Sequence, residues 1–202
     1  MKILKINPSN PDRNIIKYTA QILANGGVIV YPTDTCYGIG ADITNKHSFY
    51  KVYDIKKRPH NKPFSVIVKD TVQIQKLAII NDYQKKYIAK YYPGQITFVF
   101  LTLDYKTFPF SSIGIRIPNY KITQMISEIF SDPYITTSAN ISNYPITYDV
   151  KDLLNQLKHE NILPDLILDA GKLPKNDPST VVDLTKSSIR IIRQGGIKIK
   201  KL

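Results

Sequence analysis

The amino-acid sequence predicts an α/β domain, built on a twisted, open, mixed sheet with helices packed against it. Two observations lead to this class. About eight short apolar or alternating segments are typical of strands, and five or six amphipathic segments are typical of helices. These segments do not alternate strictly, and the last three predicted strands follow one another through short links. Such links favour antiparallel pairing among the three, so we expect a sheet of mixed direction.

The first half of the chain switches between helical and strand patterns. Residues 10–25 fit a helix with Asn10 as its N-cap, because apolar side chains recur on one face and two glycines follow its end. The buried run 28–31 fits a strand, and residues 45–57 fit a second helix. "FSVIV" from Phe64 predicts another strand. Residues 71–92 have a helical pattern that we expect to break near Asn81 and to end at "PG".

The second half is richer in strands. "ITFVFLTL" from Ile96, "IGIRI" from Ile113 and "YITTSA" from Tyr134 have the apolar, β-branched composition of strands. Residues 122–130 and 149–159 are predicted helices, since their apolar side chains recur at helical spacing. The final predicted strands are "DLILDAG", "STVVDLT" and "IRIIRQG".

Composition limits the class of protein. The chain has 202 residues, 43% of them hydrophobic and 22% charged, which suits one globular domain. No apolar run is long enough to span a bilayer and no signal peptide is visible, so we expect a cytoplasmic protein without a membrane partner. One cysteine rules out an internal disulfide, and three scattered histidines argue against a zinc site. The net charge of +12 fits a nucleic-acid partner or a genome-wide bias, and both readings stay open.

Common nucleotide and hydrolase motifs are missing from the sequence. There is no G-x-x-x-x-G-K-S/T loop, no G-x-G-x-x-G after a strand, no G-x-S-x-G and no H-E-x-x-H. A nucleotide, if bound, is therefore held in another way.

Four polar clusters are the candidate site. Three threonine or aspartate residues, 33–35, follow the buried strand at 28–31, where loops of α/β folds carry ligands. "KKRPHNK" places four cations at the predicted helix end, which favours phosphate binding. "TTSAN" ends a strand with hydrogen-bonding side chains, and Ser138 and Asn140 share a face if the strand continues. Ser179 and Arg193 belong to two late strands. Taken singly, the first three clusters also fit a turn, a cap or a helix end.

Two residues stand out within these clusters. Arg116 lies inside an apolar strand, where an unpaired guanidinium is costly, so it should meet a carboxylate from the protein or from a ligand. Cys36 should point away from Thr35 and serve packing, provided that the strand continues through both. Gly38 and Gly40 should allow a tight turn or a close approach to a ligand or a neighbouring strand.

Taken together and in this order, seven motifs make the chain resemble the YrdC/Sua5 family, the threonylcarbamoyl-AMP synthases. The motifs are "PTDTCYGIG", "KKRPHNKP", "PGQITFVF", "IGIRIP", "TSANIS", "STVVDLT" and "RQGG". The resemblance runs from about residue 14 to 196. It implies a YrdC-like fold and a single YrdC-like domain over residues 1–202, without the C-terminal Sua5 domain of longer members. The family signature K-x-R…S-x-N falls on Lys56, Arg58, Ser138 and Asn140.

The resemblance also implies an activity. Family members are nucleotidyltransferases that join L-threonine, bicarbonate and ATP into threonylcarbamoyl-AMP and pyrophosphate, with Mg²⁺ bound through ATP and not through protein side chains. The product serves t6A modification of adenosine 37 in tRNA. The implied partners are a TsaD-type threonylcarbamoyl transferase with its accessory proteins, and tRNA or double-stranded RNA is a further candidate.

Site residues follow from the same resemblance. The catalytic set is Lys56, Arg58, Ser138 and Asn140. The ATP-binding residues would be these four with Lys62, Ser112 and Arg193. The L-threonine-binding residues would be Thr33, Thr35, Arg116, Thr136 and Ser179.

The chain departs from the family pattern at three positions. Ile67 stands where members often have a histidine near the threonine, Asn143 replaces a usual glycine, and Pro178 replaces a frequent glutamate. These departures leave two alternatives to the synthase. The chain could be an RNA-binding YrdC-like paralogue without synthase activity, or a paralogue that uses another carbamoyl substrate.

Overall fold

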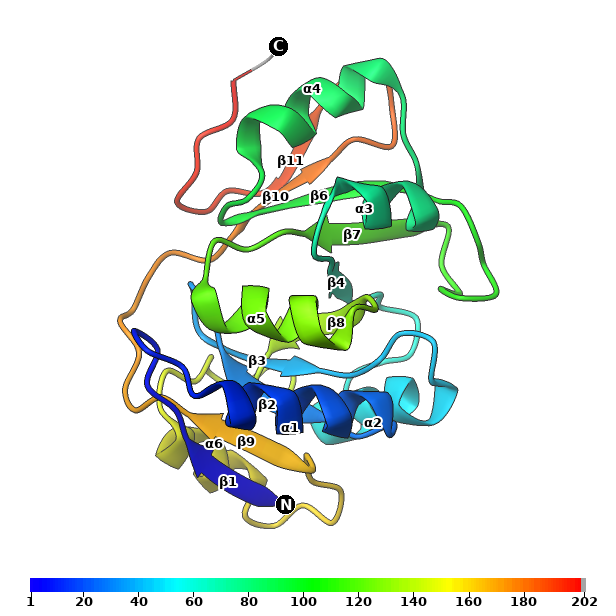
Figure 1. Cartoon of the computed structure of the whole chain (residues 1–202). Helices are drawn as coiled ribbons and strands as arrows, with labels where there is room; N and C mark the ends of the chain where they lie inside the picture. Colours follow the sequence, from blue (N-terminus) through cyan, green and yellow to red (C-terminus); the bar gives the residue numbers. More distant parts are fainter. Residues whose placement is uncertain (201–202) are drawn as a thin grey trace.

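In the computed structural model, which describes residues 1–200, one twisted mixed sheet carries helices on both faces (Figure 1). Its strands in chain order are β1 Lys2–Lys5, β2 Ile29–Pro32, β3 Tyr37–Gly40, β4 Ser65–Ile67, β5 Ala78–Ile79, β6 Ile96–Thr102, β7 Ser112–Arg116, β8 Tyr134–Ser138, β9 Leu166–Asp169, β10 Thr180–Asp183 and β11 Arg190–Arg193. Among the described residues the strand order is β1-β9-β2-β3-β8-β4-β7-β6-β10-β11, and β5 also pairs with β6. The predicted fold class is confirmed.

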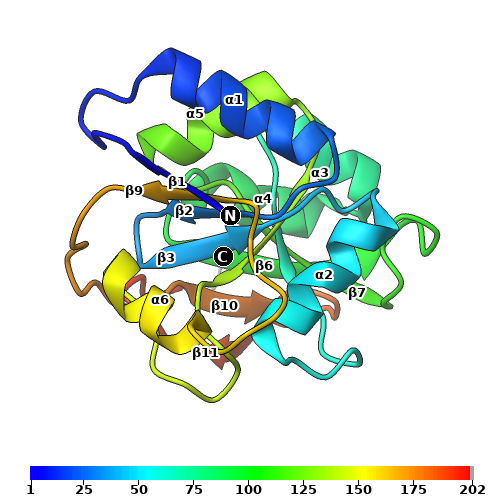
Figure 2. The same cartoon turned by 90° about the horizontal axis from the view of Figure 1, so that it is seen from below.

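Six helices cover this sheet in the described part of the chain: α1 Arg13–Ala24, α2 Lys46–Lys56, α3 Thr71–Leu77, α4 Asp82–Tyr91, α5 Lys121–Phe130 and α6 Val150–Leu157. α1 and α5 lie together on one face, while α2 and α6 lie on the opposite face (Figure 2). Within residues 1–200, every helix is too short or too polar to cross a membrane.

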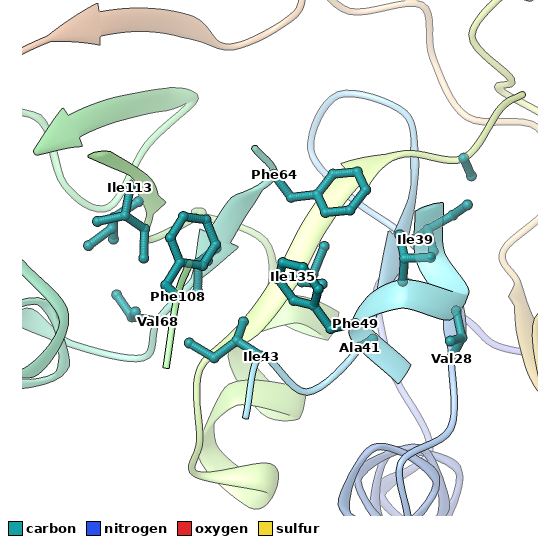
Figure 3. Close-up of a cluster of buried hydrophobic side chains, with 14 of the residues drawn as sticks. Val28, Ile39, Ala41, Ile43, Phe49, Phe64, Val68, Phe108, Ile113 and Ile135 are labelled. Carbon is teal, nitrogen blue, oxygen red and sulfur yellow. The ribbon is translucent and has the colours of Figure 1, made fainter. Parts of the chain in front are cut away.

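Each face of the sheet has its own hydrophobic core. The larger core fills the space under α2, α4 and α6, and residues such as Phe49, Phe64, Phe108 and Ile135 pack into it (Figure 3). The smaller core lies under α1 and α5 and includes Tyr31, Ile67 and Tyr134. The sheet is thus buried on both faces along much of its length, as its nearly continuous apolar strands require.

Polar caps explain where the helices begin. The side chain of Asp12 accepts from the backbone N–H of Asn14, so Asp12, and not Asn10, is the N-cap of α1. The prediction of Asn10 was wrong, because it counted Pro11 into the helix. The predicted break near Asn81 is confirmed: Asn81 and Gln84 form a reciprocal capping box that starts α4.

The three C-terminal strands do not form one antiparallel unit. β10 and β11 pair antiparallel, as expected. β9 instead lies between β1 and β2 and is parallel to both, whereas β10 is parallel to β6 near the other end of the sheet. The prediction of β9 pairing with β10 was therefore wrong. The connection between them, residues 170–179, crosses the sheet and brings Asn176 and Ser179 to the pocket described below.

β1, β3 and β5 were not predicted as strands. β3 was read as a turn because of Gly38 and Gly40, yet both are strand residues pressed on the Tyr31 ring of β2. A Cβ on Gly40 would lie 2.8 Å from Tyr31 Cε1 and 3.1 Å from the carbonyl oxygen of Ile135. The expected close approach to a neighbouring strand is confirmed, and the tight turn is not.

Candidate functional site

A cavity of about 280 Å³ opens on the α1/α5 face of the sheet, next to the core under these two helices. The strands change character there. In β8, Tyr134 is buried in the core under α1 and α5, whereas Thr136 and Ser138 on the same side of the strand line the cavity. The polar wall therefore continues the apolar face of the same sheet. Eight predicted site residues line it: Thr33, Thr35, Arg58, Arg116, Thr136, Ser138, Ser179 and Arg193.

The loop between β2 and β3 forms one wall of the cavity. Thr33 Oγ1 donates to the carbonyl of Cys36 (2.7 Å) and accepts from the backbone N–H groups of Thr35 (3.1 Å) and Cys36 (3.2 Å). The hydroxyl of Thr33 is thus used to close the turn, and Thr35 Oγ1 lies 3.1 Å from it. Of these two threonines, Thr35 has the hydroxyl that is freer to meet a ligand.

Cys36 also lines this cavity, so the expectation that it points away from Thr35 was wrong. The strand does not continue through residues 33–36, because the turn intervenes and β3 begins at Tyr37. Thr35 Oγ1 lies 3.9 Å from Cys36 Sγ. Burial raises the pKa of the Cys36 thiol, which keeps it protonated and a poor nucleophile at neutral pH.

Arg116, at the end of β7, forms a buried ion pair with Asp34. Arg116 Nη2 donates to Asp34 Oδ1 at 2.9 Å, and each side chain is only 8% exposed. The expected carboxylate therefore comes from the protein itself. Asp34 Oδ2 and Arg116 Nε are buried without a hydrogen-bond partner among the described residues. The guanidinium keeps unused donor capacity while it faces the cavity.

The backbone at Asp34 is fixed from two other segments. Its carbonyl oxygen accepts from Gln95 Nε2 (2.8 Å) and from Asn176 Nδ2 (3.0 Å). The loop before β6 and the crossing segment 170–179 are thus tied to the same turn. These ties fix the position of Arg116, because the carboxylate that holds it cannot move freely.

Lys56, at the end of α2, is buried beneath the segment that follows β8. It is 2% exposed, and its Nζ donates to the carbonyl oxygens of Ser138 (2.5 Å) and Asn140 (2.8 Å) and to Asn140 Oδ1 (3.2 Å). Ser138 Oγ donates to the same Asn140 Oδ1 at 2.6 Å. Burial, and secondarily Arg58, lower the pKa of Lys56 to about 7. Three of the four signature residues thus form one hydrogen-bonded unit.

Arg58, the fourth signature residue, lies in the loop after α2. Its Nε and Nη2 donate to the carbonyl oxygens of Lys62 (3.2 Å) and Pro63 (3.1 Å), which closes residues 58–63 into a compact loop. The guanidinium is half-buried and lines the cavity, whereas Lys62 is exposed and does not.

A second arginine approaches the cavity from the edge strand β11. Arg193 Nε and Nη2 donate to the carbonyl oxygen of Ser179 at 3.0 and 2.7 Å. Burial, and then the nearby charge of Arg116, lower the pKa of Arg193. On the opposite side, Thr136 Oγ1 accepts from the Tyr31 hydroxyl at 2.9 Å.

The remaining predicted residues lie outside the cavity wall. Asn140 is 8% exposed and accepts a hydrogen bond from Lys56. Ser112 is at the start of β7 and Arg116 is at its end, and both are on the same side of that strand. Ile67, which stands at the position of the expected histidine, is buried under α1 and α5 and does not line the cavity. Asn143 has φ 69°, which explains a usual glycine there and the tolerance for asparagine. Pro178 lines the cavity.

Sequence reasoning missed two hydroxyls on the floor of the cavity. Ser65 of β4 and Thr97 of β6 both line it, on either side of Gly114 in β7. The available signal was the one that identified Arg116: a polar residue at alternating positions of a strand that is otherwise apolar.

The cavity is suited to anions. Among its lining residues are two arginines beside Arg116 and eight serine or threonine side chains, with no aspartate or glutamate. Within the described residues, no group of three or more His, Cys, Asp or Glu could hold a metal ion.

Comparison of the sequence with known families finds one family model, Sua5_yciO_yrdC, described as "Telomere recombination", which matches residues 21–195. A protein of Methanocaldococcus jannaschii, provisionally named threonylcarbamoyl-AMP synthase, is 36% identical over 100% of this chain and 96% of its own length.

Solved structures show the same fold. Escherichia coli YciO superposes with a TM-score of 0.87 at 26% identity, covering 100% of this chain and 99% of its own. Pyrococcus abyssi Sua5 complexed with L-threonine also has a TM-score of 0.87, at 23% identity and 97% coverage of this chain. The chain spans only 58% of that Sua5 chain, so this likeness concerns the shared fold.

Proposed function

The chain belongs to the Sua5/YciO/YrdC family, and on this premise we propose that it is an L-threonylcarbamoyladenylate synthase, a nucleotidyltransferase. It joins L-threonine, bicarbonate and ATP into threonylcarbamoyl-AMP and pyrophosphate for t6A modification of tRNA. The observation that carries the proposal is a single cavity with a buried, incompletely paired Arg116 and two further arginines, Arg58 and Arg193, among hydroxyl side chains. Such a cavity can hold an amino-acid carboxylate and phosphates at once.

The amino acid is held at the Arg116 end. Arg116 offers the threonine carboxylate the donors that Asp34 leaves unused, and its buried position strengthens that contact. Thr35, Thr136 and Ser179 lie around it and contact the amino and hydroxyl groups. Thr33 acts through the turn, since its own hydroxyl already bonds the backbone of Cys36.

The phosphates are held by cations on the rim. Arg58 and Arg193 line the cavity and neutralise charge as the carbamate oxygen attacks the α-phosphorus and pyrophosphate leaves, and Ser138 lies in the same wall. Lys62 and Ser112 do not line the cavity, and we assign them to the outer phosphates of ATP. Lys56 and Asn140 act from below: Lys56 holds the backbone carbonyl of Ser138, and Asn140 accepts from its hydroxyl. Mg²⁺ accompanies ATP, because the cavity wall offers no carboxylate ligand.

The setting of the enzyme follows from its product. An activated threonylcarbamoyl group must be handed to a transferase that acts on adenosine 37 of tRNA. We therefore place the enzyme in the cytoplasm with a TsaD-type transferase and its accessory proteins as partners.

The Arg116 assignment predicts a split between the two substrates. Arg116→Lys keeps the charge but loses the fork that grips a carboxylate, so KM for L-threonine should rise about tenfold or more while KM for ATP changes less than twofold. The measurement is steady-state pyrophosphate release with each substrate varied in turn. An equal rise in both KM values contradicts the assignment.

A specific finding keeps one alternative in view. E. coli YciO, which bears no activity in its name, is 28% identical over 94% of this chain. A paralogue that uses another amine would release pyrophosphate with a different amino acid, so replacing L-threonine by serine, glycine and lysine in the same assay separates the two. An RNA-binding protein without synthase activity would bind RNA and release no pyrophosphate.

A further inference from the structure

Thr97 is a buried residue of β6 that lines the cavity and has no side-chain hydrogen bond to the described residues. The residue is 2% exposed and lines the cavity, yet its hydroxyl makes no hydrogen bond within residues 1–200. Its methyl group faces the next strand, because a Cβ placed on Gly114 would lie 3.2 Å from Thr97 Cγ2. The Thr97 hydroxyl is not among the fully buried polar atoms that lack a partner, so it is reached from the cavity, where it can bind a ligand or water.

The register of four neighbouring strands places Thr97 between two cations. Phe98 pairs with Ile115, so the preceding residue, Thr97, lies opposite Arg116. On its other side Thr97 pairs with Val181, and Val181 pairs with Arg193. Paired residues project to the same side of a sheet, and all four line the cavity. Across the floor the order is therefore Arg116, Thr97, Val181, Arg193.

Ser65 supplies a second hydroxyl on the same floor. It pairs with Gly114, and a Cβ on Gly114 would lie 3.0 Å from Ser65 Oγ. Ser65 Oγ makes no hydrogen bond in the described part of the chain and also lines the cavity. Gly114 lies between the two residues, and a Cβ there would crowd Ser65 Oγ on one side and the Thr97 methyl group on the other, so Ser65 and Thr97 lie close together across Gly114.

The reaction itself says which group belongs beside Thr97. The amine of threonine and bicarbonate give the carbamate and water, R–NH₂ + HCO₃⁻ → R–NH–CO₂⁻ + H₂O, and a carbamate oxygen then bonds the α-phosphorus. The carbamate is thus joined to threonine on one side and to phosphorus on the other. It must lie between the carboxylate site at Arg116 and the phosphate site at Arg193, which is where Thr97 lies.

We propose that Thr97 Oγ1, assisted by Ser65 Oγ, binds the planar oxyanion derived from bicarbonate, both as bicarbonate and as the carbamate formed from it. This inference rests on the synthase function proposed above. Two neutral donors suit a monoanion that already has a guanidinium on each side, since they fix its orientation without adding charge. Thr97 is in this sense a substrate-binding residue of the reaction.

The test is the bicarbonate dependence of pyrophosphate release. Thr97→Val keeps shape and removes the hydroxyl, so KM for bicarbonate should rise about ten- to hundredfold, while KM for ATP and L-threonine changes less than twofold. Thr97→Ser should restore most of the bicarbonate affinity, and Ser65→Ala should show a smaller rise. Thr102→Val is the matched control, because Thr102 is on the same strand, is 3% exposed, has an unpaired hydroxyl and does not line the cavity.

The outcomes separate the two proposals. If the wild-type protein releases no pyrophosphate with threonine and bicarbonate, the synthase function fails. If the wild type is active but Thr97→Val keeps its bicarbonate KM, or raises only KM for L-threonine, the inference on Thr97 is overturned. Binding of ¹³C-bicarbonate, followed by NMR line broadening with a non-hydrolysable ATP analogue and threonine, should be lost in Thr97→Val and kept in Thr102→Val even where turnover is slow.

Discussion

Asp34 and Arg116 form the most deeply buried ion pair of the described residues, and the ligand-binding capacity of Arg116 depends on it. A buried cation with one hydrogen-bonded carboxylate is held in place, while its unpaired Nε remains costly. The pair therefore serves orientation more than stability. The sequence indicated a carboxylate for Arg116 but left open whether protein or ligand supplies it, because residues 82 positions apart meet only in the folded chain.

Removing the carboxylate should leave an uncompensated buried cation. Asp34→Asn is expected to lower the free energy of unfolding by about 3 kcal/mol, measured by urea denaturation at pH 7. Asp82→Asn is the control, since Asp82 pairs with Lys85 at the exposed surface and its replacement should cost far less stability. Equal losses in the two variants would show that burial of the Asp34 pair has no energetic weight.

Lys56 predicts a pH dependence of stability. Its pKa falls from 10.5 to about 7 on folding, so between these values the unfolded chain binds a proton that the folded chain does not. Stability linked to Lys56 therefore rises with pH across this window. Compared with Lys56→Met, which has no such proton, the wild-type protein should gain unfolding free energy from pH 7 to pH 9.5. Parallel pH profiles of the two proteins, measured by urea denaturation, would refute the lowered pKa.

At the scale of elements, β3 shows what local patterns cannot reveal. Its sequence "YGIG" has two glycines that usually mark turns, but here they give room to the Tyr31 ring on the paired strand. The residue that requires these glycines, Tyr31, lies on another strand, and a pattern read residue by residue does not show that contact. Element existence was predicted well wherever periodicity was long, as for α1, α4 and β6.

The packing of β3 gives a ranked prediction. Gly40→Ala places a methyl group 2.8 Å from Tyr31 Cε1 and should destabilise the protein by about 1–3 kcal/mol through overpacking. Gly38→Ala meets Tyr31 at 3.2 Å and should cost less. Thermal or urea unfolding of both variants measures the order, and a larger loss for Gly38→Ala would contradict the described packing of the ring.

The sequence also did not allow us to predict that β9 and β10 lie apart in the sheet. Short links favour pairing of consecutive strands, yet β9 is drawn between β1 and β2, where Leu166 and Leu168 complete the core under α1 and α5. Which partner a buried strand takes depends on the whole set of apolar faces and not on the length of one link. This separation also builds the site, because the segment that connects β9 to β10 brings Ser179 to the cavity.

On the scale of the whole molecule, the cavity is assembled from segments between residues 33 and 193. Composition and periodicity predicted the fold class, but only the resemblance of ordered motifs predicted that these segments meet. It missed Thr97 and Ser65, because both are single hydroxyls inside apolar strands. The cavity does not account for the net charge of +12, since none of the described lysines lines it.

The most direct test of the central claim is pyrophosphate release by the purified protein with ATP, Mg²⁺, L-threonine and bicarbonate. The synthase function predicts release that requires both threonine and bicarbonate, with threonylcarbamoyl-AMP formed in equal amount. Release that persists when either co-substrate is omitted, or no release with all of them present, would contradict it.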